Sequence, residues 1–307
     1  MSTGHSIVTG PPALAAKEGQ AAGATGRRDP LGRDRRRRRV AAWVAYLFTF
    51  VVMFPLLWIV LLSFQSNAHI LSDPFSVSSL RLSNYRIAVQ TLNLLLEYKN
   101  TFILAVCSVS VGLVVSFMSS YALTRMVFKH RRLQVGIRYF FLAGLAVPVY
   151  VLLFPVYRLD IYFHVFGTYV ALILPYIAVS VPFNTLLLTG FLVSLPNEIE
   201  EAAVIDGCSL FAMCRRVVIP VMRPVFATLL VFNVIYVWNE FPFAVTLINK
   251  ASLTTIALGV SQFQGVYSIE YGAMMASATM VLIPQLVIYA IFQKQVVAGL
   301  TLGAVKG

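Results

Sequence analysis

Six long apolar runs constrain this chain more than any other feature of its sequence. At about 1.5 Å of helix per residue, each run reaches or approaches the roughly 30 Å of hydrocarbon in a bilayer. A helix that crosses hydrocarbon satisfies all of its backbone groups internally. We therefore expect an all-α integral membrane fold with six transmembrane helices. The runs are residues 40–62, 101–123, 139–157, 168–192, 224–248 and 271–292.

The composition argues against a soluble enzyme, because 59% of the residues are hydrophobic and only 12% are charged, against about 25% charged in an average soluble domain. The formal charge of +12 does not indicate nucleic-acid binding, since the basic residues lie at the ends of the apolar runs. Eight of them fall between Arg27 and Arg39, in a stretch without apolar periodicity. We expect residues 1–39 to form a disordered, basic cytoplasmic tail that acts as a topology signal, and residues 40–307 to form the membrane domain.

The distribution of lysine and arginine predicts the orientation of the spans. If the spans alternate in direction, nineteen of the 24 basic residues lie on the side of the N-terminal tail, which the positive-inside rule identifies as the cytoplasm. Both termini and the loops 124–138 and 193–223 should then be cytoplasmic. Residues 63–100, 158–167 and 249–270 should be external.

The sequence lacks the groups that would let it drive transport by itself. No Gly-Lys dipeptide occurs, so a phosphate-cradling ATPase loop is absent. The three cysteines and four histidines have no metal-ligand spacing, so we expect neither a metal nor another cofactor. Glu240 is the one ionisable residue clearly inside a run, at about 24 Å from the cytoplasmic end of its helix. We expect it to face the bundle or a wet cavity, and we expect a separate ATPase subunit to supply the energy.

The loop 195–224 has the local signals of two short helices. Pro196 suits a first helical turn, and Gly207 can supply the left-handed residue that ends the helix. Ser209 can cap a second helix that finishes with Arg215 and Arg216 at its negative end. The first helix also carries negative charge at its positive end, from Glu198, Glu200 and Glu201. A rigid element of this kind is typical of a docking surface for a cytoplasmic partner.

The same loop contains a spaced set of residues, namely Glu201-Ala202-Ala203, Asp206-Gly207, Val217, Ile219 and Pro220. This pattern resembles the EAA loop of binding-protein-dependent ABC importer permeases. Two substitutions in the motif are conservative, since Val217 stands for the family's isoleucine and Ile219 for its leucine.

Three further stretches are similar to the carbohydrate branch of that family, in particular to the permease subunit related to the smaller membrane subunit of the maltose transporter. These are SYALTR at 120–125, WNE at 238–240 and the C-terminal GLTLGAVKG at 299–307. The resemblance covers residues 40–307 and does not include the basic tail.

The resemblance implies a function and its partners. In this family a permease sits in the bacterial inner membrane with a second permease subunit, two ATPase subunits and an extracellular or periplasmic binding protein that delivers the sugar. The EAA helices sit in clefts of the ATPases, so that ATP-driven closure tips the helix bundle and no bond is made or broken in the permease. The residues expected to dock on the ATPase are Glu201, Ala202, Ala203, Asp206 and Gly207, with Arg215 and Arg216 as secondary candidates.

A sugar path is expected along the helix formed by the fifth run. Aromatic faces and hydrogen-bonding side chains commonly hold sugars, and three of the candidates lie at i, i+3 and i+7 on one helix face. An alternative is that the aromatic residues form an interfacial belt and the polar ones fasten helix contacts. The candidates are Asn233, Tyr236, Trp238, Asn239 and Glu240.

Two other functions compete with a sugar importer. One is an ABC permease for a different solute, such as amino acids or polyamines. The other is a self-sufficient secondary carrier or an integral membrane enzyme, against which the lack of intramembrane charges and the EAA spacing both argue.

Overall fold

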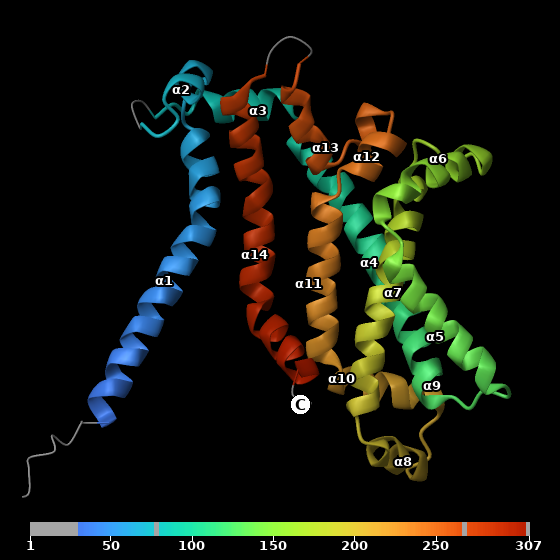
Figure 1. The fold of residues 1–307 in the computed structure, drawn as a ribbon. Helices are drawn as coiled ribbons and strands as arrows, with labels where there is room; N and C mark the ends of the chain where they lie inside the picture. Colours follow the sequence, from blue (N-terminus) through green and yellow to red (C-terminus); the bar gives the residue numbers. More distant parts are fainter. Residues whose placement is uncertain (1–29, 77–79, 266–268, 305–307) are drawn as a thin grey trace, which may run out of the picture. The chain divides into compact units, whose positions relative to one another are not determined.

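The computed structural model describes residues 30–76, 80–265 and 269–304, and within these ranges every regular element is a helix (Figure 1). The chain divides into two compact units, Met1–Phe54 and Pro55–Gly307. The described part of the first unit belongs to a single helix, α1 (Pro30–Leu62). The second unit contains the remaining helices and both candidate functional regions.

Helix α1 begins at Pro30 rather than at residue 40, so residues 30–39 of the expected disordered tail are helical. The reason is that arginine is a good helix former, and a helix already started in the apolar segment extends through neighbouring arginines at little cost. Proline at the first helical position suits such a start. Residues 1–29 of the expected tail lie outside the described residues.

The second unit contains long helices joined by short ones. They are α2 (Asn67–Ser72), α3 (Ser83–Thr91), α4 (Leu94–Arg125), α5 (Arg131–Ala146), α6 (Leu153–Tyr162), α7 (Tyr169–Ser194), α8 (Asn197–Ile205), α9 (Leu210–Met213), α10 (Ile219–Val221), α11 (Arg223–Asn239), α12 (Pro242–Leu247), α13 (Ile256–Val260) and α14 (Tyr271–Ala304). Short 3-10 turns occupy Val149–Leu152, Ala251–Leu253 and Ser261–Phe263, and a π-turn occupies Cys214–Val218.

Four helices in the described ranges are long and apolar enough to cross a membrane, namely α1, α4, α7 and α14. Two further helix pairs are bent by more than 40°, and the count rises to six if each bent pair is one span. The six apolar runs of the sequence therefore correspond to four continuous helices and two broken ones.

The third apolar run is the first broken span. Helix α5 and the segment Val149–Tyr162 meet at an angle of 95°, so the expectation of one continuous helix over 139–157 is wrong. The break lies at Val147, which is extended, and Pro148. Proline disfavours the helical conformation of the residue before it and cannot donate the next backbone hydrogen bond.

The fifth apolar run is also broken. The interruption lies where α11 ends, at Asn239 rather than at residue 248. The 77° bend between α11 and the segment Leu210–Val221 is a separate one that precedes the run. Glu240 is extended, and α12 starts after it at Pro242. The physical reason is again proline, because its ring would clash with the carbonyl one turn earlier and it lacks the N–H for that turn. A hydropathy profile does not reveal the helix break after Asn239, because the residues on both sides of the break are apolar.

Small residues let α4 and α7 pack closely together. A Cβ on Gly112 would lie 2.9 Å from Ser180 Oγ of α7, a separation at which something would have to shift. Ser116 and Ser120 are buried, and their hydroxyls donate to carbonyls one turn back at 2.6 and 2.7 Å. Small and hydroxylated residues of this kind are typical of close helix contacts in membranes.

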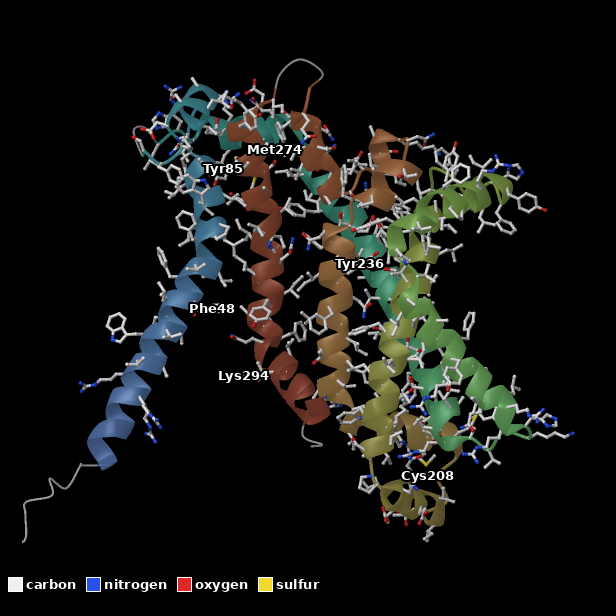
Figure 2. The ribbon with its side chains drawn as sticks, in the orientation of Figure 1. Phe48, Tyr85, Cys208, Tyr236, Met274 and Lys294 are labelled. Atoms are coloured by element: carbon white, nitrogen blue, oxygen red, sulfur yellow. The ribbon has the colours of Figure 1, made fainter. Side chains whose placement is uncertain are left out.

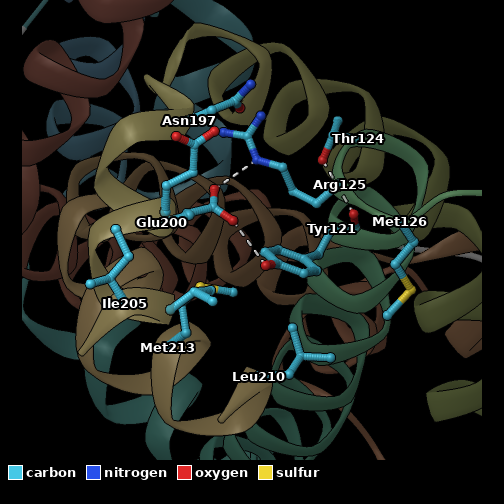
Figure 3. A pocket seen from close by; sticks show the side chains of 11 residues that line it. Tyr121, Thr124, Arg125, Met126, Asn197, Glu200, Ile205, Leu210 and Met213 are labelled. Atoms are coloured by element: carbon cyan, nitrogen blue, oxygen red, sulfur yellow. Dashed lines mark hydrogen bonds and ion pairs between the residues drawn. The ribbon is translucent and has the colours of Figure 1, made fainter. Parts of the chain in front are cut away.

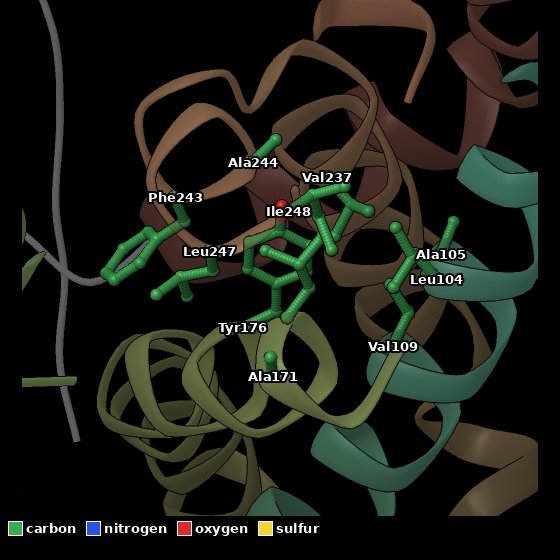
Figure 4. Close-up of a cluster of buried hydrophobic side chains, with 11 residues drawn as sticks. Leu104, Ala105, Val109, Ala171, Tyr176, Val237, Phe243, Ala244, Leu247 and Ile248 are labelled. Atoms are coloured by element: carbon green, nitrogen blue, oxygen red, sulfur yellow. The ribbon is translucent and has the colours of Figure 1, made fainter. Parts of the chain in front are cut away.

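Two clusters of buried apolar side chains form most of the core of the second unit. One joins α4, α7, α11 and α12 around Tyr176 and Phe243 (Figure 4). The other lies nearer to α8 and joins α4, α7 and α11 with the segment 213–222, around Leu188 and Leu229. The two clusters place the α8–α10 region and the α11–α12 break toward opposite ends of the unit.

The loops of the second unit gather at two ends (Figure 1). Helices α2, α3, α12 and α13 lie at one end, and α8, α9 and α10 lie at the other. The segments that the charge count assigns to the external side thus share one end, and the segment 193–223 lies at the other.

Candidate functional site

The segment from α8 to α10, referred to below as the α8–α10 loop (residues 197–221), has the local structure that its sequence predicts up to Met213. Helix α8 begins after Pro196 and ends at Ile205. Gly207 has a φ of 77°, and the N–H groups of Cys208 and Gly207 donate to the carbonyls of Ala203 and Val204, both at 3.0 Å. These two bonds form the Schellman arrangement that a left-handed glycine permits.

The second short helix starts as predicted but does not finish there. Ser209 caps α9, and its hydroxyl accepts a hydrogen bond from the Ala212 N–H at 3.3 Å. The chain then continues through the π-turn into α10 without a helix end. The expectation that Arg215 and Arg216 terminate the helix is therefore wrong, and both lie exposed inside the π-turn. The helix continues because Val217, Val218 and the residues after them can bury an apolar face.

The predicted docking residues divide into exposed and buried groups. Ala203 is buried against the core of the unit, in the cluster that contains Leu188 and Leu192. The others are exposed, namely Glu201, Ala202, Asp206, Gly207, Arg215 and Arg216. Large apolar side chains are exposed beside them, namely Val204, Ile205, Leu210 and Phe211.

One acidic residue of α8 turns inward and forms a buried ion pair (Figure 3). The Arg125 Nε donates to Glu200 Oε1 at 2.7 Å, and the Tyr121 hydroxyl donates to Glu200 Oε2 at 2.9 Å. Arg125 Nη2 also donates to the carbonyl oxygens of Leu192 and Leu195 at 3.0 and 2.9 Å. The guanidinium therefore links the end of α4, the end of α7 and the first turn of α8.

This pair was not predicted from the sequence. Glu200 was expected to interact with the dipole of its own helix, whereas it is buried and reaches a residue 75 positions away. The available signal was the SYALTR stretch, which contains both Tyr121 and Arg125. An open pocket of about 640 Å³ lies beside the pair, between the end of α4 and the helices α8 and α9.

The candidate sugar-path residues lie toward the other end of the unit. Figure 2 labels Tyr236 on α11, and Cys208 of the α8–α10 loop well away from it. The Asn233 side chain donates to Asn184 Oδ1 of α7 at 3.0 Å, and the Tyr236 ring contacts the Tyr176 ring edge-on, with centroids 6.3 Å apart. These residues of α11 therefore face α7.

Glu240 is buried at the break between α11 and α12. Its Oε1 accepts a bond from the Phe243 N–H at 2.6 Å, and its Oε2 accepts bonds from the Ala244 N–H at 3.1 Å and the Tyr176 hydroxyl at 2.6 Å. Glu240 thus caps α12 and fastens it to α7. It faces the bundle, as expected, but as an anchor for a helix break rather than as a group in the middle of a span.

The remaining two candidates face other helices. Trp238 is buried with its ring 5.9 Å from that of Tyr98 on α4. Asn239 and Gln285 of α14 exchange two side-chain hydrogen bonds, each 3.0 Å long. The structure therefore does not bring the five candidates together at one point. Among the described residues, no group of three or more potential ligands could hold a metal ion.

Comparison with known proteins places this architecture in a family. Residues 108–301 match the family described as the inner membrane component of binding-protein-dependent transport systems. The chain is 32% identical over 276 residues to a diacetylchitobiose uptake system permease of Streptomyces coelicolor, which covers 89% of this chain and 90% of that protein. It is also 32% identical over 278 residues to a trehalose/maltose transport system permease of Thermococcus litoralis, covering 86% of this chain and 95% of that one.

The fold agrees with that relationship. A chain of a bacterial ABC transporter that imports alginate superposes with a TM-score of 0.71 at 20% identity, over 85% of this chain and 96% of that one. A shared fold at this identity says nothing of the solute. The family match and the relatives together identify the chain as a multi-pass permease subunit of the binding-protein-dependent ABC importers.

Proposed function

We propose that this permease imports a sugar or short oligosaccharide together with a second, different permease subunit. The α8–α10 loop would transmit the movement of separate ATPase subunits to the helices. The observation that carries the proposal is the surface of that loop. It exposes Val204, Ile205 and Phe211 in the part of the chain that the structure describes, although its base is anchored by a buried ion pair. Exposed apolar side chains on a braced element are suited to contact a partner protein.

The docking residues on this surface are the exposed members of the predicted set. Glu201, Asp206 and Arg215 would supply charges at the rim of the contact, whereas Ala202 lets a partner approach the helix closely. Ala203 contributes indirectly, because it packs α8 onto the core. The charge count supports a cytoplasmic position for this end and for both termini.

The proposal of a sugar rests on the relatives, whose names mention diacetylchitobiose and trehalose/maltose. Among the path candidates, Trp238 has the strongest case. It lines an open pocket of about 610 Å³ together with Tyr98 and Lys99, and its buried Nε1 has no hydrogen-bond partner among the described residues. Asn233, by contrast, already bonds within the chain.

The docking role is tested by two substitutions in the complete importer. Gly207→Asp places a side chain at a left-handed position, at a cost of about 1 kcal/mol, and on the exposed surface. Glu201→Lys reverses a charge there. We expect normal membrane insertion of both variants but loss of ATPase co-purification, of ATP hydrolysis stimulated by loaded binding protein, and of uptake into vesicles.

The matched control for these variants is Lys129→Glu, a charge reversal at an exposed residue of the loop 124–138. It should retain all three activities. Full ATPase association, stimulation and uptake in both loop variants would refute the docking role.

The sugar path is tested by Trp238→Phe, which keeps an aromatic ring but removes the indole N–H. We expect a higher KM for uptake with unchanged ATPase association. Uptake assays with sugars and amino acids as competing solutes distinguish a sugar permease from one for another solute. If Trp238→Phe kept the wild-type KM for uptake, Trp238 would not be part of the sugar path.

A further inference from the structure

A second pocket lies at the end of α4, where Thr124 lines both it and the pocket beside α8. It has a volume of about 270 Å³ and is enclosed by α5, by the last turns of α7 and by the end of α4. The Gln134 side chain on α5 donates to the Leu123 carbonyl at 2.8 Å and so links α5 to α4 at its rim. Neither the docking residues nor the sugar-path candidates line this pocket.

Two arginines of α5 line the pocket. Arg131 and Arg138 are seven residues apart, which places them on one helix face about 10 Å apart along the axis. Both are exposed, and the ion pair found in the described part of the chain uses neither of them. The pocket therefore carries two positive charges that no acidic side chain among the described residues pairs with.

Arg138 lies where an arginine without an anionic partner is unfavourable. Arg138 lies two turns into a helix that forms half of a candidate span. A cation at that depth is costly unless its long side chain reaches the interface or it meets an anion. In the predicted topology Arg138 is the last residue before the third apolar run, which puts its side chain at the boundary of the span, where the headgroups of anionic lipids lie.

Six of the ten other residues that line the pocket are apolar, among them Phe141 on α5 and Leu186 and Val193 on α7. The other four are polar, namely Thr124, Gln134, Thr185 and Thr189. Leu186 is 41% exposed, so the apolar wall is open to the surroundings of the helix pair. A site with two cations at one end and an apolar wall at the other matches the chemistry of a phospholipid better than that of a free anion.

We propose that this pocket binds one anionic phospholipid, with its phosphate between Arg131 and Arg138 and an acyl chain against the α5 and α7 walls. Basic pockets between transmembrane helices are suited to such headgroups. The bound lipid would hold α5 against α7 near the turn of α4 that carries Arg125. The proposal does not depend on which solute the permease carries.

The test uses the assembled importer in nanodiscs of phosphatidylcholine with increasing phosphatidylglycerol. Native mass spectrometry counts the phosphatidylglycerol molecules that remain bound after delipidation. Arg131→Gln and Arg138→Gln should each weaken retention of one lipid about fivefold, since an arginine near anionic lipid contributes about 1 kcal/mol. The matched control is Arg132→Gln, an exposed neighbour that does not line the pocket, and it should retain the lipid.

A second variant tests the apolar wall without changing any charge. Leu186→Trp should fill the pocket and reduce retention of the same lipid, with normal complex yield. Equal losses from all three arginine variants would mean a diffuse surface charge and would overturn the proposal. Arginine-dependent binding of inorganic phosphate in pure phosphatidylcholine discs, without any preference for phosphatidylglycerol, would overturn it in favour of a free-anion site.

Discussion

Two buried glutamates, Glu200 and Glu240, lie toward opposite ends of the second unit, and different contacts hold them. Glu200 is 8% exposed and Glu240 is 5% exposed. Glu200 pairs with the guanidinium of Arg125 and with a phenol, both from α4. Glu240 pairs with a phenol and with two backbone N–H groups of the helix that follows it. One carboxylate therefore meets a full positive charge, and the other meets only dipoles.

The contacts of Glu200 join segments that are distant in sequence, whereas those of Glu240 mainly cap the helix that follows it. Because Arg125 also bonds the last carbonyls of α7, the Glu200 pair ties together three helix ends, and movement of α8 would reach both α4 and α7. The Glu240 contacts fix the direction in which α12 leaves α11, and only the Tyr176 bond extends beyond that junction. The first arrangement is suited to transmit force and the second to hold shape.

The largest effect should come from Arg125→Leu, which leaves Glu200 buried without its cation. Breaking a buried pair by removing one partner costs about 3–5 kcal/mol. We expect the purified complex to lose its monodisperse peak in size-exclusion chromatography at a clearly lower temperature, and uptake to fall. The double variant Arg125→Leu/Glu200→Leu should recover most of the stability, since apolar replacement of both partners is often tolerated. If Arg125→Leu alone were as stable as the wild type, the cation would not distinguish the contacts of Glu200 from those of Glu240.

An intermediate effect is expected for Glu240→Leu. Loss of a helix cap costs about 1–2 kcal/mol, and the Tyr176 hydroxyl would lose its acceptor at a further cost of about 1 kcal/mol. The same thermal assay should show a smaller shift than Arg125→Leu, with ATPase association retained. Phe232→Leu, at an exposed position of α11, is the control. A loss of ATPase binding would show that Glu240 is more than a local cap.

The smallest effects should distinguish the two phenols. Tyr176→Phe should cost about 1.5 kcal/mol, because it removes one of the three donors that the described residues supply to the Glu240 carboxylate, none of them a cation. Tyr121→Phe should cost about 0.5–1 kcal/mol, because Arg125 still pairs with Glu200. Thermal shifts of the two variants measured side by side check the order. The opposite order would mean that the Arg125 guanidinium stabilises the Glu200 carboxylate less than their 2.7 Å separation suggests.

Much of the fold could be predicted because it depends on local patterns. The apolar runs locate the helices, and the spacing of Pro196, Gly207 and Ser209 predicts both short helices of the loop. The break at Pro148 and the end of α11 at Asn239 were missed, because hydropathy averages over a proline in an apolar stretch. The inward turn of Glu200 was missed because its cause, Arg125, is remote in sequence.

The π-turn at Cys214–Val218 has a consequence for how the length of this region can vary. A π-turn closes its hydrogen bonds over one residue more than an α-turn, so it accommodates one extra residue without interrupting the helix. Deletion of one residue there would restore α-helical geometry and leave α9 facing largely as it does now relative to α10, whereas the same deletion in a regular α-helix would rotate the preceding residues by about 100°. Phe211, now exposed, would keep its outward position. The π-turn thus lets this region lose one residue while the contact surface and the spans both keep their orientation.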